Sequence, residues 1–189
     1  MLVLQQPILT TTHGGYTLLL GHNPAYYRDV LGQPWGTAWE DPAPHEWRQQ
    51  LEQQMASQIP PVRDEVARDR WMYALAQKHI RNQPWLSFQA SLMQVGRLWD
   101  VQPHHASSRT ISPTLSLAML VFYSLITLGW VLGLVSMIGG KRWALWWPLI
   151  TQIVVFSAVH FVYWADMRMR APLIPSLALL AACGYRDLF

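Results

Sequence analysis

The sequence predicts a mainly α-helical membrane protein, in which an N-terminal soluble module with a short β/loop start and amphipathic helices precedes two or three transmembrane helices. Two long uncharged runs carry most of this prediction, one from Pro113 to Gly140 and one from Trp143 to Ala165. Each run is long enough to cross a hydrocarbon core of about 30 Å. The first 112 residues contain nine Lys or Arg and nine Asp or Glu, a balance typical of a water-soluble module.

These observations divide the chain into a soluble module, residues 1–112, and a transmembrane region, residues 113–189. The expected helices of that region lie at about 113–140, 143–165 and 171–186. The third segment is short, and it crosses a bilayer only if it is extended or if the bilayer thins locally.

The distribution of basic residues bears on orientation. Lys141 and Arg142 occupy the shortest loop, which favours a cytoplasmic loop and an outward-facing soluble module. Arg168 and Arg170 place the same number of cations on the other side of the membrane, so the positive-inside rule gives little preference for either orientation.

Composition excludes several classes of function. The net charge of +3 arises entirely from the transmembrane region, and no basic run with interleaved aromatic residues occurs, so nucleic acid is not an expected partner. Cys183 is the only cysteine, and the histidines lack the spacing of metal ligands. No metal or cofactor is therefore expected.

The soluble module begins with β-prone segments. Residues 2–4, 8–12 and 16–20 are rich in aliphatic and β-branched side chains around a turn at His13–Gly15, which predicts short extended pieces. Residues 25–43 interleave glycine and proline with tryptophan, which predicts an aromatic-rich loop.

Three helices are expected next in the module. Pro44 begins a polar helix that continues to about Ser57. Asp64 is suited to cap a helix at about 65–81, and Pro84 suits the first turn of the helix that follows.

In the last of these helices the apolar residues recur at three- and four-residue steps. The stripe consists of Trp85, Phe88, Leu92, Val95 and Trp99, with Gln89, Gln94 and Arg97 off it. One interpretation is ordinary packing in a protein core. The other is a helix that lies on the membrane surface ahead of the first span.

The most concentrated polar segment of the transmembrane region is Asp166–Arg170, which is followed by Pro172 and Pro175. Arg168 and Arg170 are two residues apart, so their side chains diverge on a helix and converge only in an extended or proline-terminated loop. Two guanidinium groups at headgroup depth suit a phosphate. The alternative is that both side chains only anchor the ends of helices.

His160, near the end of the second uncharged run, also has two interpretations. It is either a histidine that is hydrogen-bonded within its helix or a member of a site. The sequence contains no GxSxG, P-loop, dinucleotide fingerprint or HExxH signature. Alternating charges at residues 63–70 predict a solvated helix face with salt bridges.

Three stretches, in this order, resemble motifs of one family of membrane enzymes. Thr10–Pro24 is similar to a "T-x-x-G-G-x-x-L…G-N-N-P" loop, and Ile80–Pro84 with Leu98–Trp99 is similar to an "I-x-x-x-P…R-x-x-x-F-W" helix. His160–Pro175 with Leu180–Ala182 is similar to an "H…R-Y-R-x-P-x-x-P…L-A-A" ending. The family comprises bacterial polytopic glycosyltransferases of the dolichyl-phosphate-mannose–protein mannosyltransferase type (family 39-like, GT-C).

Two positions depart from the family's pattern. His22 stands where the loop usually has Asn, and Met169 stands where Tyr or Phe is usual.

The resemblance implies transfer of a sugar from a polyprenyl-phosphate donor to an acceptor on the outer face of the bacterial inner (cytoplasmic) membrane. It implies that Arg168, Arg170 and His160 bind the lipid phosphate. By the same resemblance, three further residues belong to a loop over the site: Gly14, Gly15 and Asn23.

The catalytic aspartate of the family lies in an outward loop that no segment of this sequence matches, so no catalytic residue is assigned. We expect the C-terminal segment of an integral-membrane glycosyltransferase-like protein, without turnover by the chain alone. Its expected partners are membrane lipid, the polyprenyl-phosphate sugar and the N-terminal part of the enzyme. The first alternative is a non-enzymatic membrane subunit or anchor whose outward loop binds a partner. A small transporter component is a second alternative, which the uncharged spans disfavour.

Overall fold

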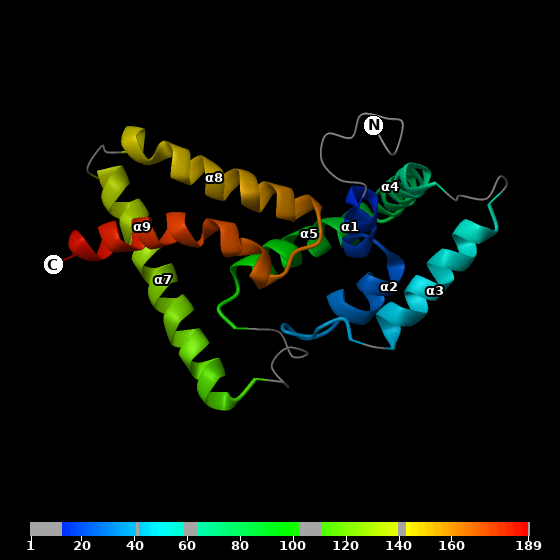
Figure 1. The fold of residues 1–189 in the computed structure, drawn as a ribbon, viewed down its shortest axis with the longest axis horizontal. Coiled ribbons are helices and arrows are strands. Elements are labelled where there is room, and N and C mark those ends of the chain that lie inside the picture. Colours follow the sequence, from blue (N-terminus) through cyan, green and yellow to red (C-terminus); the bar gives the residue numbers. More distant parts are fainter. Residues whose placement is uncertain (1–12, 41, 59–63, 103–110, 140–142, 189) are drawn as a thin grey trace. The chain divides into compact units, whose positions relative to one another are not determined.

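The structure is a computed structural model that describes residues 13–40, 42–58, 64–102, 111–139 and 143–188. The described residues are mainly α-helical and include no strand, so the predicted helical class is confirmed. The chain divides into two compact units. Unit 1 comprises Met1–Gln94 and Phe161–Trp164, and unit 2 comprises Val95–His160 and Ala165–Phe189. Figure 1 shows the path of the chain and the helix labels.

Unit 1 contains the helices that precede the apolar runs. They are α1 (Gly14–Gly21), α2 (Pro24–Tyr26), the π-helical turn η1 (Tyr27–Leu31), α3 (Ala43–Ala56), α4 (Glu65–Asn82) and most of α5 (Pro84–Trp99). The helices predicted to start near Pro44, after Asp64 and at Pro84 are confirmed. Asp64 caps α4 as expected, because its Oδ2 accepts a hydrogen bond from the Ala67 amide at 3.1 Å.

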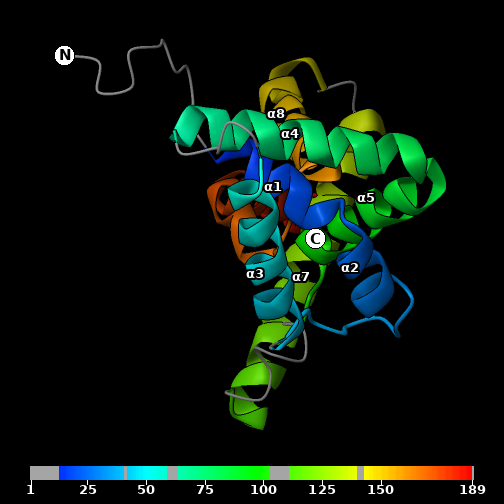
Figure 2. The ribbon, with the colours of Figure 1, turned by 90° about the vertical axis from the view of Figure 1, so that its right-hand side faces the viewer.

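The prediction of a β-prone segment at residues 16–20 is wrong, because these residues lie in α1. Leu18 and Leu19 are buried in a core that also contains residues of α3 and α4. Figure 2 shows α4 lying across α1. Burial between these helices decides the conformation, and it overrides the local β propensity. Residues 2–12, the rest of the predicted β start, lie outside the described residues.

α1 approaches α4 through a glycine. The Gly15 amide donates a hydrogen bond to Asp69 Oδ1 at 2.6 Å. A Cβ atom at position 15 would overlap the Asp69 carbonyl oxygen. The close contact therefore requires glycine.

The predicted aromatic loop at residues 25–43 is helical in its first part. α2 and η1 extend to Leu31, and residues 32–40 have no regular structure. Asn23 explains the difference, because its Oδ1 accepts a hydrogen bond from the Tyr26 amide at 2.8 Å and so caps a helix that proline begins.

Unit 2 contains the last turn of α5 and the apolar helices. The other helices are α7 (Pro113–Gly139), α8 (Trp143–Val162), the 3₁₀ helix η2 (Met167–Leu173) and α9 (Ile174–Arg186). Five buried residues form its core: Met137, Ile153, Leu173, Leu177 and Leu180.

Among the described residues, one helix is long and apolar enough to cross a membrane, namely Pro113–Met137 of α7. Only 11% of its most apolar window is buried. Large apolar side chains are therefore exposed along it, among them Leu117, Val121, Phe122, Leu125, Leu128, Val131 and Val135. A continuous apolar surface of this kind is unusual for a monomeric soluble protein.

The second and third predicted spans are not confirmed. The apolar part of α8 runs from Trp146 to Val162, which is about 25 Å at 1.5 Å per residue. α9 begins only at Ile174, because η2 occupies the start of the predicted segment, and it is shorter still. Neither reaches the thickness of about 30 Å that a span needs unless the bilayer thins locally.

Glycines also set the contact between α7 and α9, which cross in Figure 1. A Cβ at Gly133 would overlap the Leu180 carbonyl oxygen, and a Cβ at Gly184 would overlap backbone atoms of Gly129 and Gly133. The helix backbones are therefore in direct contact, as at small-residue interfaces of membrane helices.

We expect Gly133→Leu to lower the free energy of unfolding of unit 2 by about 1–3 kcal/mol, the usual cost of overpacking. Val131→Leu is the matched control, because residue 131 is on the same helix and is exposed. Thermal unfolding in detergent, followed by circular dichroism, measures the effect. Equal unfolding temperatures for the two variants would contradict this packing.

Candidate functional site

The Asp166–Arg170 segment caps and begins η2, and its two arginine side chains point in different directions. Asp166 caps η2, and its Oδ1 accepts a hydrogen bond from the Arg168 amide at 3.2 Å. In a 3₁₀ helix with three residues per turn, residues two apart point in different directions. Arg168 is accordingly exposed and Arg170 is buried, so in this conformation the two guanidinium groups lie in different environments.

Arg168 makes a surface ion pair. Its Nη2 lies 3.2 Å from Asp166 Oδ2, and its side chain is 84% exposed. Pairs of this kind contribute about 0–1 kcal/mol. Arg168 is thus accessible to a ligand in solution or at a membrane surface.

Arg170 is only 3% exposed. Its Nη1 donates a hydrogen bond to the Leu98 carbonyl at 3.2 Å, and its Cζ lies 4.2 Å from the centroid of the Tyr123 ring. Within the described part of the chain, the buried Nε and Nη2 atoms have no hydrogen-bond partner. Leaving buried donors unsatisfied costs about 1–3 kcal/mol each, and more for a charged group.

The surroundings of Arg170 affect its charge in opposite directions. Burial lowers the pKa of the guanidinium, whereas Tyr123 and the Asp100 carboxylate raise it. An arginine stays protonated in proteins, so the buried charge has to be stabilised by an acceptor. Two unsatisfied N–H donors of one guanidinium suit the oxygens of a carboxylate or a phosphate.

His160 is hydrogen-bonded within its own helix. Its Nδ1 lies 2.9 Å from the Phe156 carbonyl, to which it donates, and its ring lies 4.5 Å from that of Phe156. This confirms the interpretation as a hydrogen-bonded helix residue. In the part of the chain that the structure describes, no hydrogen bond or ring contact joins His160 to Arg168 or Arg170.

The three residues assigned to a loop over the site hold unit 1 together. Gly14 and Gly15 allow α1 to contact Tyr73 and Asp69 of α4. Asn23 is fully buried and uses its whole side chain, since its Nδ2 also donates to the Leu19 and Leu20 carbonyls at 3.0 Å. Their proposed position over the arginines stays a prediction, because they belong to unit 1 and the arginines belong to unit 2.

Sequence reasoning missed the role of Phe161–Trp164, the four residues just before the predicted site. Trp164 donates its amide to the Thr17 carbonyl at 3.3 Å and packs its ring 5.3 Å from that of Tyr26. The hydroxyls of Tyr163 and Tyr73 are 2.9 Å apart. The aromatic content of this segment is the signal in the sequence that could have found it.

His22 joins the same segment to the interior of unit 1. Its Nε2 donates to the Val162 carbonyl at 3.0 Å, and its Nδ1 faces the Tyr27 hydroxyl at 3.5 Å. That hydroxyl lies 2.8 Å from Ser87 Oγ. Burial lowers the pKa of His22, although the hydrogen bond to Val162 partly opposes this effect. The neutral tautomer therefore fits its partners.

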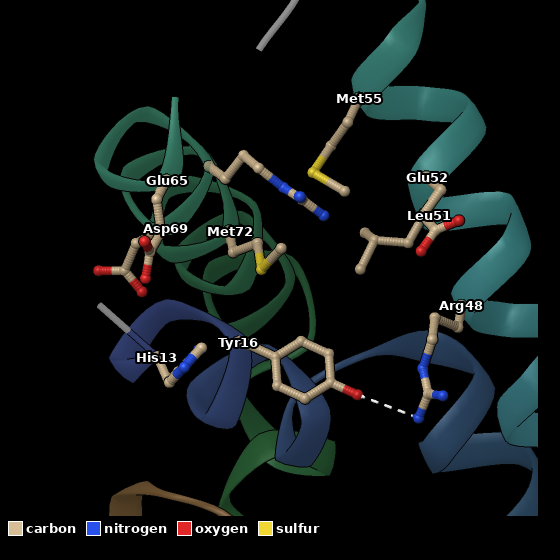
Figure 3. Close-up of a pocket in the computed structure, with 10 residues that line it drawn as sticks. His13, Tyr16, Arg48, Leu51, Glu52, Met55, Glu65, Asp69 and Met72 are labelled. Carbon is tan, nitrogen blue, oxygen red and sulfur yellow. Dashed lines mark hydrogen bonds between the residues drawn. The ribbon is translucent and has the colours of Figure 1, made fainter. Parts of the chain in front are cut away.

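A cavity of about 470 Å³ lies among α1, α3 and α4 in unit 1 (Figure 3). Its apolar lining includes Leu51, Met55 and Met72, and Tyr16 accepts a hydrogen bond from Arg48 at 3.4 Å. Three carboxylates also line it, those of Glu52, Glu65 and Asp69. The guanidinium groups of Arg48 and Arg68 line it as well, so acidic and basic side chains nearly balance there and the lining shows no preference for a phosphate.

Comparison with known protein families, with curated proteins and with solved structures finds no match to this chain.

The buried neutral His22 predicts a pH dependence of the stability of unit 1. Below its ordinary pKa of about 6.5, the unfolded chain binds a proton that folded His22 resists, so the free energy of unfolding falls as the pH falls. We expect His22→Asn, which keeps a donor for Val162, to make the unfolding temperature less dependent on pH between about pH 7 and pH 5.

Thermal unfolding of the full chain in detergent, followed by tryptophan fluorescence, measures this slope. His79, whose pKa is lowered by burial and by Lys78, contributes to the remaining slope. His45→Asn is the control, because His45 is exposed on α3. Parallel curves for wild type and His22→Asn would contradict the assignment.

Proposed function

We propose that this chain is the C-terminal segment of an integral-membrane, glycosyltransferase-like protein that uses a polyprenyl-phosphate sugar donor, and that Arg170 binds the phosphate of that donor. The observation that carries the proposal is the buried Arg170 guanidinium, two of whose nitrogens lack hydrogen-bond partners among the described residues. A phosphate accepts two parallel hydrogen bonds from a guanidinium. The motif resemblance at His160–Pro175 independently suggests a phosphate at this position.

The membrane part of the proposal rests on α7. This helix is long and apolar enough to cross a bilayer and exposes most of its apolar window. Burial of that surface in lipid would remove the cost of exposing it to water. An inner bacterial membrane is the location that the resemblance implies.

Contact with α7 revises the expected depth of the site. Tyr123, which lies under the guanidinium, is ten residues after Pro113, or about 15 Å along the helix. If α7 crosses the membrane, Arg170 is therefore deeper than the headgroup level expected from the sequence. Ionisable groups at such depth usually mark binding sites, because an unpaired charge there is costly.

The proposed role of Arg170 is electrostatic. During sugar transfer the bond between the sugar and the phosphate breaks, and negative charge grows on the departing phosphate. A fixed guanidinium beside that phosphate stabilises the charge most strongly where water is excluded. Arg168 is accessible and is proposed as a secondary contact. The resemblance assigns the general base to a loop that this sequence does not match, so the proposal for these residues concerns donor binding.

We expect Arg170→Lys to weaken binding of a polyprenyl phosphate by about ten- to a hundredfold. The charge remains but the paired donors are lost, and hydrogen bonds to charged groups contribute about 1.5–3 kcal/mol. Arg186→Lys is the matched control and should bind nearly as the wild type does, because Arg186 is an exposed arginine of α9 that is paired with Asp187. Titration of the full chain in detergent micelles, followed by tryptophan fluorescence, measures the affinity, and circular dichroism verifies the helix content.

Three outcomes would contradict the proposal. Unchanged affinity in a folded Arg170→Lys variant would remove Arg170 from the site. Equal losses in the two lysine variants would show that the effect is not specific to Arg170. Equal affinity of the wild type for a polyprenyl phosphate and for the uncharged polyprenol would favour the alternative, a non-enzymatic membrane anchor.

A further inference from the structure

The part of α5 in unit 1 exposes three of its large apolar side chains: Trp85 is 66% exposed, Leu92 52% and Phe88 44%. Leu86 and Met93 of the same helix pack against the core of unit 1. Its buried positions include three polar residues, Ser87, Ser91 and Gln94. The predicted packing of the apolar stripe into a protein core is therefore wrong for Trp85, Phe88 and Leu92.

The polar residues of α5 are buried because they bind other parts of unit 1. Ser87 Oγ lies 2.8 Å from the Tyr27 hydroxyl, and Gln94 Nε2 donates to the Gly21 carbonyl at 3.3 Å. These bonds fix which side of α5 faces inward. The outward direction of the apolar stripe is thus determined by the fold of unit 1.

The exposed stripe continues beyond α5. The Trp85 and Phe88 rings stack with their centroids 5.8 Å apart, and Phe88 contacts Phe161 at 6.1 Å. Val162, next in the chain, is 44% exposed. Together Trp85, Phe88, Leu92, Phe161 and Val162 form the apolar patch of unit 1.

We infer that this apolar patch contacts the lipid of the membrane that α7 is proposed to cross. An amphipathic helix whose apolar side carries Trp, Phe and Leu is typical of a helix in the membrane interface, and tryptophan is enriched there. The inference rests on the membrane part of the proposed function and adds a second segment of lipid contact.

Continuity along α5 favours lipid over a partner protein. α5 is one helix, and its last residue, Trp99, lies 5.4 Å from Trp130 of α7 by ring centroids. Trp99 Nε1 also donates to Ser157 of α8 at 3.1 Å. Leu92 is seven residues before Trp99 in the same helix.

Collision accessibility of spin labels tests the inference in the full chain. A Cys183→Ser background removes the native cysteine, and single labels are introduced by Trp85→Cys and Leu92→Cys. Leu125→Cys reports on α7, and Gln77→Cys, at an exposed position of α4, is the matched water-facing control. The chain is reconstituted in phosphatidylcholine vesicles, and circular dichroism verifies that each variant is folded.

Labels at 85 and 92 should collide with oxygen, which concentrates in lipid, several-fold more than with a water-soluble nickel chelate, as label 125 does. Label 77 should show the opposite preference. Chelate access at 85 and 92 like that at 77, with label 125 in lipid, would overturn the α5 inference alone. Protection of 85 and 92 from both reagents would also overturn it, since a protein surface would then cover the patch. A water-exposed label 125 would overturn the membrane part of the proposed function.

Discussion

A guanidinium removed from water needs acceptors for its N–H groups, and residues of α5 and α7 lie around the guanidinium of Arg170. Arg170 receives the Leu98 carbonyl from α5, the Tyr123 ring from α7 and the field of Asp100. The 3₁₀ form of η2 turns this side chain inward while Arg168 remains outside. Among the described residues, protein groups satisfy only part of the guanidinium, and the anionic ligand proposed above would supply the remaining acceptors.

The sequence predicts where most helices lie, but not which side of each helix is buried. Proline, Asp64 and the uncharged runs indicate where α3, α4, α5, α7 and α8 begin, because caps and composition act locally. The residues of α1 have β-prone side chains, and only burial against α4 makes them helical. The stripe of α5 was visible, yet its direction depends on distant partners of Ser87 and Gln94, which no local pattern records.

The sequence singles out the candidate residues, but it does not predict their geometry. Two arginines between apolar runs drew attention to η2, and the choice between convergence and divergence depended on the backbone conformation. Local sequence left that conformation open, because Asp166 and Pro172 suit either a loop or a tight helical turn. The glycines and Asn23 of the N-terminal motif have packing and capping roles in this structure. A motif found by resemblance to enzymes can therefore have a structural role that does not depend on binding.

The assignment of Phe161–Trp164 to unit 1 has a consequence for biosynthesis. The segment supplies the Val162 carbonyl to His22 and the Trp164 ring to Tyr26, yet it includes the last residues of α8 and comes after all of α7. During translation, the first helices of unit 1 leave the ribosome long before this segment exists. Unit 1 can therefore reach its final form only after α7 and α8 have been made, so that maturation of the N-terminal module follows synthesis of the helix proposed to cross the membrane.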